Sequence, residues 1–173
     1  SSAASDVYKR QRKDLKDWSG LGLAIQAYGK RAPVVVKFID ELGANRNGMM
    51  MRLVKGAYWD QEIKIHQVKG AVDLPVFTSK SFTDLNYLST AKIISETKNL
   101  RPYFATHNAH TIAGIMQLYQ GREDQFEFQR IFGMGDLTYR NAQKVYSDFP
   151  LTRVYAPVGS KKELLPYLVR RLL

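Results

Sequence analysis

The chain contains no cysteine among its 173 residues. This absence excludes a disulfide scaffold, a thiolate nucleophile, a cysteine-ligated zinc site and a cysteine-ligated iron–sulfur cluster. No apolar run reaches the roughly 18 residues that a membrane-spanning helix needs. Acidic residues are fewer than basic ones, because 26 Lys and Arg stand against 16 Asp and Glu and give a net charge of +10. This excess favours an anionic partner: nucleic acid, acidic lipid, a phosphorylated cofactor or a carboxylate substrate.

Several motifs are also missing. No Gly-x-Gly-x-x-Gly follows an early strand, which argues against a dinucleotide-binding doubly wound fold, and no Walker-type phosphate loop is present. Paired acids of the glycosidase kind and an obvious hard-metal site are lacking too. The first residues are polar and do not resemble a secretory signal, while the last two, Leu172 and Leu173, are apolar and uncapped. We therefore expect a piece of a longer protein.

Short apolar runs recur along the chain at intervals of about 25 to 30 residues, the spacing typical of alternating strands and helices. Helical patterns separate them at 33–42, 83–97, 109–119 and 161–173, with Thr83 and Asp84 as the expected N-cap of the second. Six such units predict a parallel α/β sheet, either open and doubly wound or three-quarters of a (β/α)8 barrel, which needs eight units. The six expected strands are 21–25 (LGLAI), 50–54 (MMRLV), 75–78 (PVFT), 102–106 (PYFAT), 126–131 (FEFQRI) and 153–156 (RVYA).

Polar residues mark the ends of these strands, where barrel enzymes place their chemistry. They are Gln26, Thr78 and Lys80, Thr106-His107-Asn108, Gln129-Arg130 and Tyr155, with Arg52 inside the second strand. Arg52 lies between two apolar residues. Because burying a charge costs free energy, a cation at this position indicates a specific role. A metal site at His107 and His110 lacks a matching carboxylate, so a hydrogen-bonding histidine is the better interpretation.

The last predicted helix places Tyr167, Arg170 and Arg171 on one face, because their offsets are three and four residues. Two adjacent guanidinium groups form a planar receptor for a carboxylate or phosphate. The alternative is a basic last turn favoured by the helix dipole.

Five ordered segments resemble the proline dehydrogenase domain of the bifunctional proline utilization A enzymes, from about Trp18 to the last residue. These segments are 52–59 (RLVKGAYW), 104–110 (FATHNAH), 133–135 (GMG), 155–159 (YAPVG) and 167–173 (YLVRRLL). The resemblance implies a distorted (β/α)8 barrel that oxidises L-proline to Δ1-pyrroline-5-carboxylate with FAD and passes electrons to a membrane quinone. It makes residues 18–173 the last three-quarters of that barrel and leaves 1–17 as a basic N-terminal extension or helix. It also implies a cytoplasmic protein that can meet the inner membrane surface, without a metal.

The resemblance also assigns roles. Arg52 corresponds to the arginine beside the reactive flavin nitrogen. The remaining expected FAD contacts are Gln26, Val54, Gly56, Trp59, Thr78, Lys80, Thr106 and His107. The expected proline pocket consists of Tyr58, Ile131, Tyr155 and Tyr167, with Arg170 and Arg171 holding the carboxylate. Arg52, Tyr155, Arg170 and Arg171 are the expected catalytic set.

The chain departs from the family pattern in three ways. Ile131 replaces a leucine; two strands that carry a substrate-contacting lysine and a supporting aspartate are missing before Gln26; and a glutamate beyond Leu173 is missing. We therefore expect an incomplete barrel with unpaired edges, catalytically poor by itself and completed by the rest of a parent chain that can include an aldehyde dehydrogenase domain.

Two other classes of function stay open at this point. A nucleic-acid-binding module would use the net charge and the basic stretch 9–13, although it leaves the tyrosines and arginines at strand ends unexplained. A half-barrel that only binds a partner is the third alternative.

Overall fold

The computed structural model describes residues 18, 20–46, 48–162, 164–165 and 168. Five strands form one parallel sheet in the order β1-β2-β3-β4-β5: β1 (Gly22–Gln26), β2 (Met49–Val54), β3 (Leu100–Ala105), β4 (Glu127–Ile131) and β5 (Thr152–Tyr155). The helices between them are α2 (Ala32–Ala44), α3 (Trp59–Val68), α4 (Lys80–Ser95), α5 (Ala109–Leu118) and α6 (Asp136–Val145), with a short 3-10 turn at Glu123–Gln125. The prediction of an α/β fold with a parallel sheet is confirmed, and the sheet does not close into a barrel.

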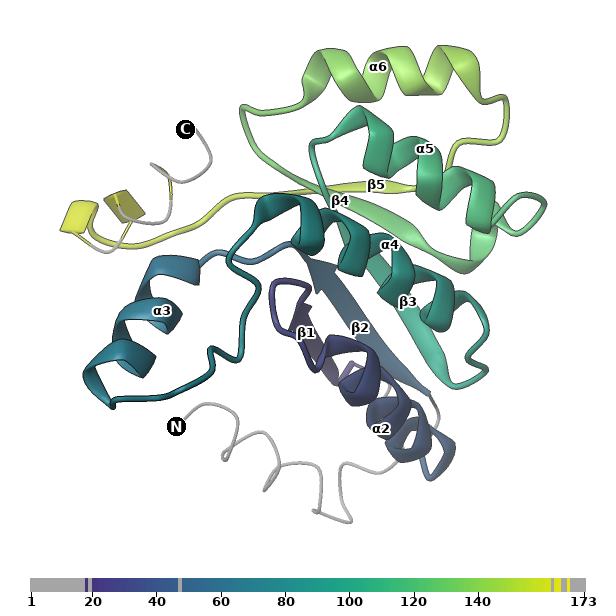
Figure 1. Cartoon of the computed structure of the whole chain (residues 1–173). Coiled ribbons are helices and arrows are strands. Elements are labelled where there is room, and N and C mark those ends of the chain that lie inside the picture. The colour runs from purple at the N-terminus through teal and green to yellow at the C-terminus, as the bar shows by residue number, and fades with distance from the viewer. Residues whose placement is uncertain (1–17, 19, 47, 163, 166–167, 169–173) are drawn as a thin grey trace.

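The helices α2, α4, α5 and α6 cover one face of the sheet, and α3 lies apart from them (Figure 1). This arrangement follows from the strand sequences, because side chains alternate between the two faces. In β2, Met51 and Leu53 face the helices and are fully buried, and Phe104 and Phe128 continue the apolar layer on the neighbouring strands. Arg52, between Met51 and Leu53, therefore points to the other face, which the described helices leave uncovered.

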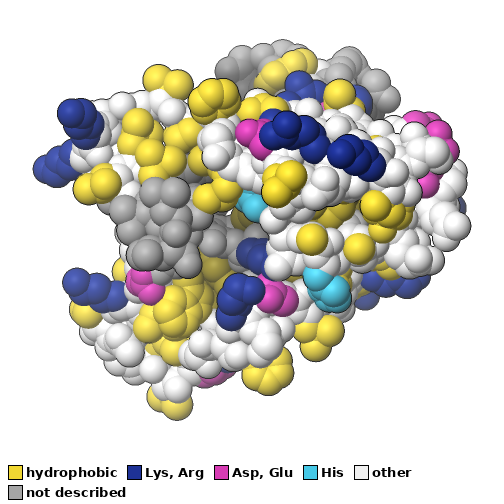
Figure 2. Space-filling model, turned by 90° about the horizontal axis from the view of Figure 1, so that it is seen from above, with side chains coloured by type: hydrophobic (Ala, Val, Ile, Leu, Met, Phe, Trp, Pro, Cys, Tyr) yellow, Lys and Arg dark blue, Asp and Glu magenta, His cyan; other side chains and the backbone are white. Residues whose placement is uncertain are grey.

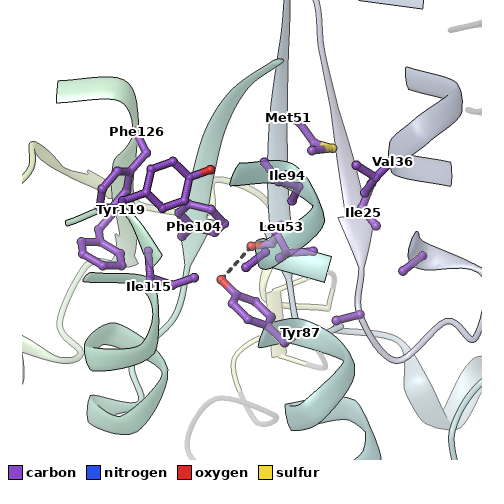
Figure 3. Close-up of a cluster of buried hydrophobic side chains, with 14 of the residues drawn as sticks. Ile25, Val36, Met51, Leu53, Tyr87, Ile94, Phe104, Ile115, Tyr119 and Phe126 are labelled. Carbon is purple, nitrogen blue, oxygen red and sulfur yellow. Dashed lines mark hydrogen bonds between the residues drawn. The ribbon is translucent and has the colours of Figure 1, made fainter. Parts of the chain in front are cut away.

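Tyr87 connects α4 to the sheet at the level where the strands end (Figure 3). Its hydroxyl donates to the backbone oxygen of Leu53 at 3.3 Å and lies 3.4 Å from that of Ala105. Burial raises the pKa of Tyr87 well above its ordinary value, so the hydroxyl stays protonated and acts as a donor. This contact fixes α4 against the carboxyl ends of β2 and β3.

The run 75–78 is not a strand of the sheet, so the prediction of six strands is wrong. Val76 instead makes an isolated antiparallel bridge with Gly29. Pro75 provides no backbone N–H for a sheet ladder, and the segment passes beside the turn after β1 on its way to α4.

Two helix boundaries also differ from those predicted. Helix α4 begins at Lys80 with Ser79 as N-cap, because Thr83 is buried inside the helix and its N–H bonds to the Ser79 oxygen. Helix α2 continues through Gly43 to Ala44, past the predicted end at residue 42. A Cβ on Gly43 would lie 2.7 Å from the backbone oxygen of Asn99, so this glycine permits a close approach inside the helix. Most of the predicted helix 161–173 and all of segment 1–17 lie outside the described residues.

Candidate active site

A cleft of about 540 Å³ lies where the strands β1, β2, β3 and β5 end. Figure 2 shows this hollow from above, with Lys, Arg and His side chains at it. The carboxyl ends of parallel strands share one edge of the sheet, so residues far apart in sequence meet there. The lining residues are Ala24, Gln26, Arg52, Val54, Lys55, Gly56, Ala57, Tyr58, Lys80, Ala105, Thr106, His107, Asn108 and Tyr155.

Arg52 is the central cation of the cleft. Its Nε donates to Oε1 of Gln129 on β4 at 2.7 Å. Its guanidinium carbon lies 4.8 Å from the centre of the Tyr155 ring, which is a cation–π contact worth on the order of 0.5–2 kcal/mol. Arg52 is thus held from two sides in one orientation, with its charged end at the cleft.

The loop after β2 forms one wall and is fixed to β1. Oε1 of Gln26 accepts a hydrogen bond from the backbone N–H of Ala57 at 3.1 Å. Gly56 has φ +136°, and a Cβ there would lie 1.8 Å from Cδ1 of Tyr28. Only glycine combines that backbone conformation with this close approach. The loop consequently presents backbone groups, Tyr58 and Lys55 to the cleft.

Two lysines at the cleft share one carboxylate. Nζ of Lys55 lies 2.6 Å from Oδ1 of Asp84, and Nζ of Lys80 lies 2.7 Å from Oδ2. Burial tends to raise the pKa of Asp84, but hydrogen bonds and charge from both lysines outweigh this and lower the pKa below its ordinary 3.8. With two cations and one anion, the group keeps one net positive charge beside the cleft.

His107 follows β3 and contacts β4. Its Nε2 accepts a hydrogen bond from the backbone N–H of Ile131 at 3.0 Å, so the proton of a neutral ring is on Nδ1. The hydroxyl of Tyr139 donates to the backbone oxygen of Thr106 at 2.9 Å, and burial raises the pKa of this tyrosine. His107 is therefore oriented as a neutral hydrogen-bonding group, as its position at a strand end suggested.

The structure brings most of the sequence-predicted site residues to this one cleft: Gln26, Arg52, Val54, Gly56, Tyr58, Lys80, Thr106, His107 and Tyr155. Three others lie outside its lining. Trp59 donates from Nε1 to the backbone oxygen of Phe77 at 2.6 Å, Thr78 is exposed, and the Ile131 side chain is buried. Tyr167, Arg170 and Arg171 lie outside the described residues.

Sequence reasoning missed Lys55 and the partner role of Gln129. The sequence did contain a signal for Lys55, because this lysine directly follows β2 and therefore lies at the carboxyl end of a parallel strand, where the cleft is. Gln129 was noted only as a strand-end residue, and no spacing rule connects it with Arg52, 77 residues away. Among the described residues no three His, Asp or Glu side chains are grouped to hold a metal ion, and none of the described helices is both long and apolar enough to cross a bilayer.

The parallel sheet, the helices on one of its faces and a polar cleft at the carboxyl ends define the class: part of a (β/α)8-type barrel that carries its site at that edge. Residues 3–173 match the family model described as proline dehydrogenase, a match that includes most of the segment before Trp18. The chain belongs to the proline dehydrogenase family, which is flavin-dependent in general.

The relatives are much longer than this chain. The bifunctional protein PutA of Escherichia coli K12 is 48% identical over 170 residues, which cover 92% of this chain and 13% of the relative. The bifunctional protein PutA of Rhizobium meliloti is 47% identical over 166 residues, with the same coverage. The carbapenem antibiotics biosynthesis protein CarD of Pectobacterium carotovorum is 30% identical over 172 residues, covering 96% of this chain and 43% of that protein.

Solved structures of proline utilization A also resemble this chain. A crystal structure of bifunctional proline utilization A has a TM-score of 0.87 and 46% identity, covering 99% of this chain and 18% of that one. The proline utilization A of Bdellovibrio bacteriovorus, inactivated by N-propargylglycine, gives a TM-score of 0.84 at 34% identity with the same coverage. The resemblance inferred from the motifs is confirmed.

Proposed function

We propose that this chain forms part of an FAD-dependent proline dehydrogenase that oxidises L-proline to Δ1-pyrroline-5-carboxylate. The observation that carries the proposal is the convergence on one cleft of Arg52 from β2, His107 from the loop after β3, Lys80 from the start of α4 and Tyr155 from β5. The family membership supports the same reaction, and the names of the bifunctional relatives supply proline as the substrate class.

The side chains at the cleft fit a flavin nucleotide. Arg52, Lys55 and Lys80 supply positive charge, which suits a pyrophosphate and the negative charge of a reduced flavin. The amide of Gln26 and the imidazole of His107 supply hydrogen-bonding groups, and no group of three carboxylate or histidine side chains among the described residues competes for a metal. We assign Val54, Gly56, Trp59, Thr78 and Thr106 to the same cofactor region.

In this reaction the substrate loses a hydride from the ring carbon next to nitrogen and a proton from the nitrogen, so that a C=N bond replaces the C–N bond. When bound, the flavin supplies the electron-accepting chemistry. The protein must hold the ring carbon within about 3–3.5 Å of the acceptor, because reaction requires this approach. Tyr58 and Tyr155 provide aromatic walls for a small ring at the cleft.

The carboxylate end of proline requires a cationic receptor. We assign this role to Arg170 and Arg171, with Tyr167 and Ile131 as further pocket residues. Arg170, Arg171 and Tyr167 remain predictions from sequence.

The electrons then pass to a membrane quinone. We place the protein in the cytoplasm with access to the inner membrane surface, which the net charge of +10 favours. The remaining barrel and an aldehyde dehydrogenase domain are the expected partners within a bifunctional parent.

FAD titration of the chain, followed by anaerobic addition of L-proline and then a quinone, tests the proposal. We expect FAD to bind, proline to bleach its visible absorbance slowly, and the quinone to restore it. Pyrrolidine, which has the ring without the carboxylate, should bleach it more slowly still. A chain that binds no FAD, or whose FAD is untouched by proline, would contradict the proposal; full turnover would contradict the expectation that the isolated chain is a poor catalyst.

A further inference from the structure

A continuous line of side-chain contacts crosses the face of the sheet opposite the helices. It runs from Arg153 on β5 through Glu127 and Gln129 on β4 to Arg52 on β2, and ends on the ring of Tyr155. Glu127 and Gln129 on β4, like Arg153 and Tyr155 on β5, are two positions apart and therefore lie on one face of their strand. The contacts of Arg52 with Gln129 and Tyr155 place it on the same face. The line connects the interior of the incomplete barrel with the cleft.

Glu127 determines the orientation of the Gln129 amide. The carboxylate is buried, with 3% of Glu127 exposed, and Arg153 binds it with Nε at 2.8 Å and a terminal nitrogen at 2.9 Å. An ionised carboxylate only accepts hydrogen bonds, so it attracts the Nε2 of Gln129, which lies 3.5 Å from Oε1 of Glu127. The amide oxygen is then turned toward Nε of Arg52, the bond of 2.7 Å.

The partner of Arg52 is neutral, in contrast to the partners of neighbouring arginines. Arg130 pairs with Asp136 at 2.6 Å and Arg153 pairs with Glu127, so a carboxylate compensates each of these charges. Among the described residues no carboxylate pairs with Arg52. An amide acceptor fixes the guanidinium in place and leaves its full positive charge at the cleft.

We propose that Gln129 is a positioning residue that holds Arg52 at the cleft without neutralising it, with its amide oriented by the Glu127–Arg153 pair. The use of that charge beside a flavin rests on the proposed function, whereas the positioning itself concerns the chain alone. A carboxylate at position 129 would also accept the Nε–H of Arg52 and would oppose its charge, but its other oxygen would then repel the buried Glu127 carboxylate 3.5 Å away. Glutamine avoids both the loss of charge at Arg52 and this repulsion.

The first test uses the chain without flavin. The Nε–H signal of Arg52 in a ¹H–¹⁵N spectrum, assigned by its loss in Arg52→Lys, should be protected from solvent exchange. Gln129→Leu should remove that protection, Gln129→Glu should retain it, and Gln117→Leu, a change on the exposed side of α5, should leave it unchanged. Protection that survives in a folded Gln129→Leu chain, or its absence in the wild type, would overturn the proposal.

The second test measures the potential and affinity of bound FAD. Gln129→Glu should shift the flavin midpoint potential downward with the fold retained, and Gln129→Leu should weaken FAD binding by about tenfold, as expected for loss of a charge-assisted hydrogen bond. Gln117→Glu is the matched control for added charge. An unchanged potential in Gln129→Glu would contradict the claim that the neutral partner matters. If neither the wild type nor any variant bound FAD, the proposed function would fail. The exchange measurement, which needs no flavin, would still show whether Gln129 positions Arg52.

Discussion

The two faces of this sheet are formed by alternate residues of the same strands, and they differ in polarity and in role. The face toward the helices is apolar and closely packed, with Leu53 and Phe104 fully buried. The opposite face carries Arg52, Gln129 and Glu127, which are connected by hydrogen bonds. Stability is therefore concentrated on one face and binding chemistry on the other, so substitutions one residue apart should have different consequences.

The largest effect is expected on the packed face. Phe104→Ala removes a fully buried ring that packs against Tyr119 and Phe126, and should lower the free energy of unfolding by about 3–5 kcal/mol. Chemical denaturation of the chain measures this. The matched control is Phe132→Ala, because 75% of Phe132 is exposed, and it should change stability by less than about 0.5 kcal/mol. Equal losses in both variants would refute the assigned core.

Arg52→Met should reverse this pattern, with function lost and stability largely kept. Removing a preorganised cation should slow proline-dependent flavin reduction by about 100-fold, roughly 2.7 kcal/mol. The free energy of unfolding should fall by only about 1–2 kcal/mol, because the variant loses the contacts with Gln129 and Tyr155 but leaves the apolar core intact. Anaerobic stopped-flow measurement of flavin bleaching, with the exposed Arg101→Met as control, checks this; comparable rates in the two variants would show that Arg52 has no special role.

Gly56→Ala tests the loop after β2, which forms one wall of the cleft. The new Cβ would overlap the Tyr28 ring and occupy a φ of +136°, which together should cost about 2–3 kcal/mol of stability. Gly70→Ala is the control, because its φ is +65° with no atom within 4 Å of the added Cβ, and it should cost only about 1 kcal/mol. The difference between their thermal unfolding free energies gives the combined cost of the contact with Tyr28 and of the less favourable φ at position 56. No difference would mean that the loop can move away.

The smallest effect is expected at Asp84. Because its pKa is lowered by Lys55 and Lys80, its contribution to stability is present above the ordinary pKa of 3.8 and is lost as the pH falls through the lowered value. Asp84→Asn should therefore reduce stability by less than about 1 kcal/mol at neutral pH and flatten the acid end of the stability profile. Denaturation at several pH values measures this. A steeper acid dependence in the variant would contradict the assignment.

Much of this architecture was predictable from local sequence. Short apolar runs of strand length predicted each of the five strands, and the position of Arg52 between Met51 and Leu53 predicted a cation with a specific role. Helices α3 and α6 were not predicted. Helix α3 buries none of its residues, so its apolar spacing carries little helical signal, whereas α6 is amphipathic but mostly polar and buries only Tyr139.

The failures share a physical cause, which is dependence on contacts between distant residues. The run 75–78 has strand composition, but its neighbours in space decide that Val76 pairs with Gly29 instead of joining the sheet. Likewise, the polarity of Gln129 is visible in the sequence, whereas its orientation depends on Glu127 and its partner Arg52 lies 77 residues away. The sequence thus predicted which residues reach the cleft better than what fixes them there.

Hydrogen–deuterium exchange of the chain with and without FAD tests the division between the two faces most directly. Bound FAD should slow amide exchange in the loops after β2 and β3, at residues 55–58 and 106–108, and leave helices α2 and α5 unchanged. Protection confined to the helices, or no protection at these loops at saturating FAD, would contradict the assignment of the cleft as the flavin site.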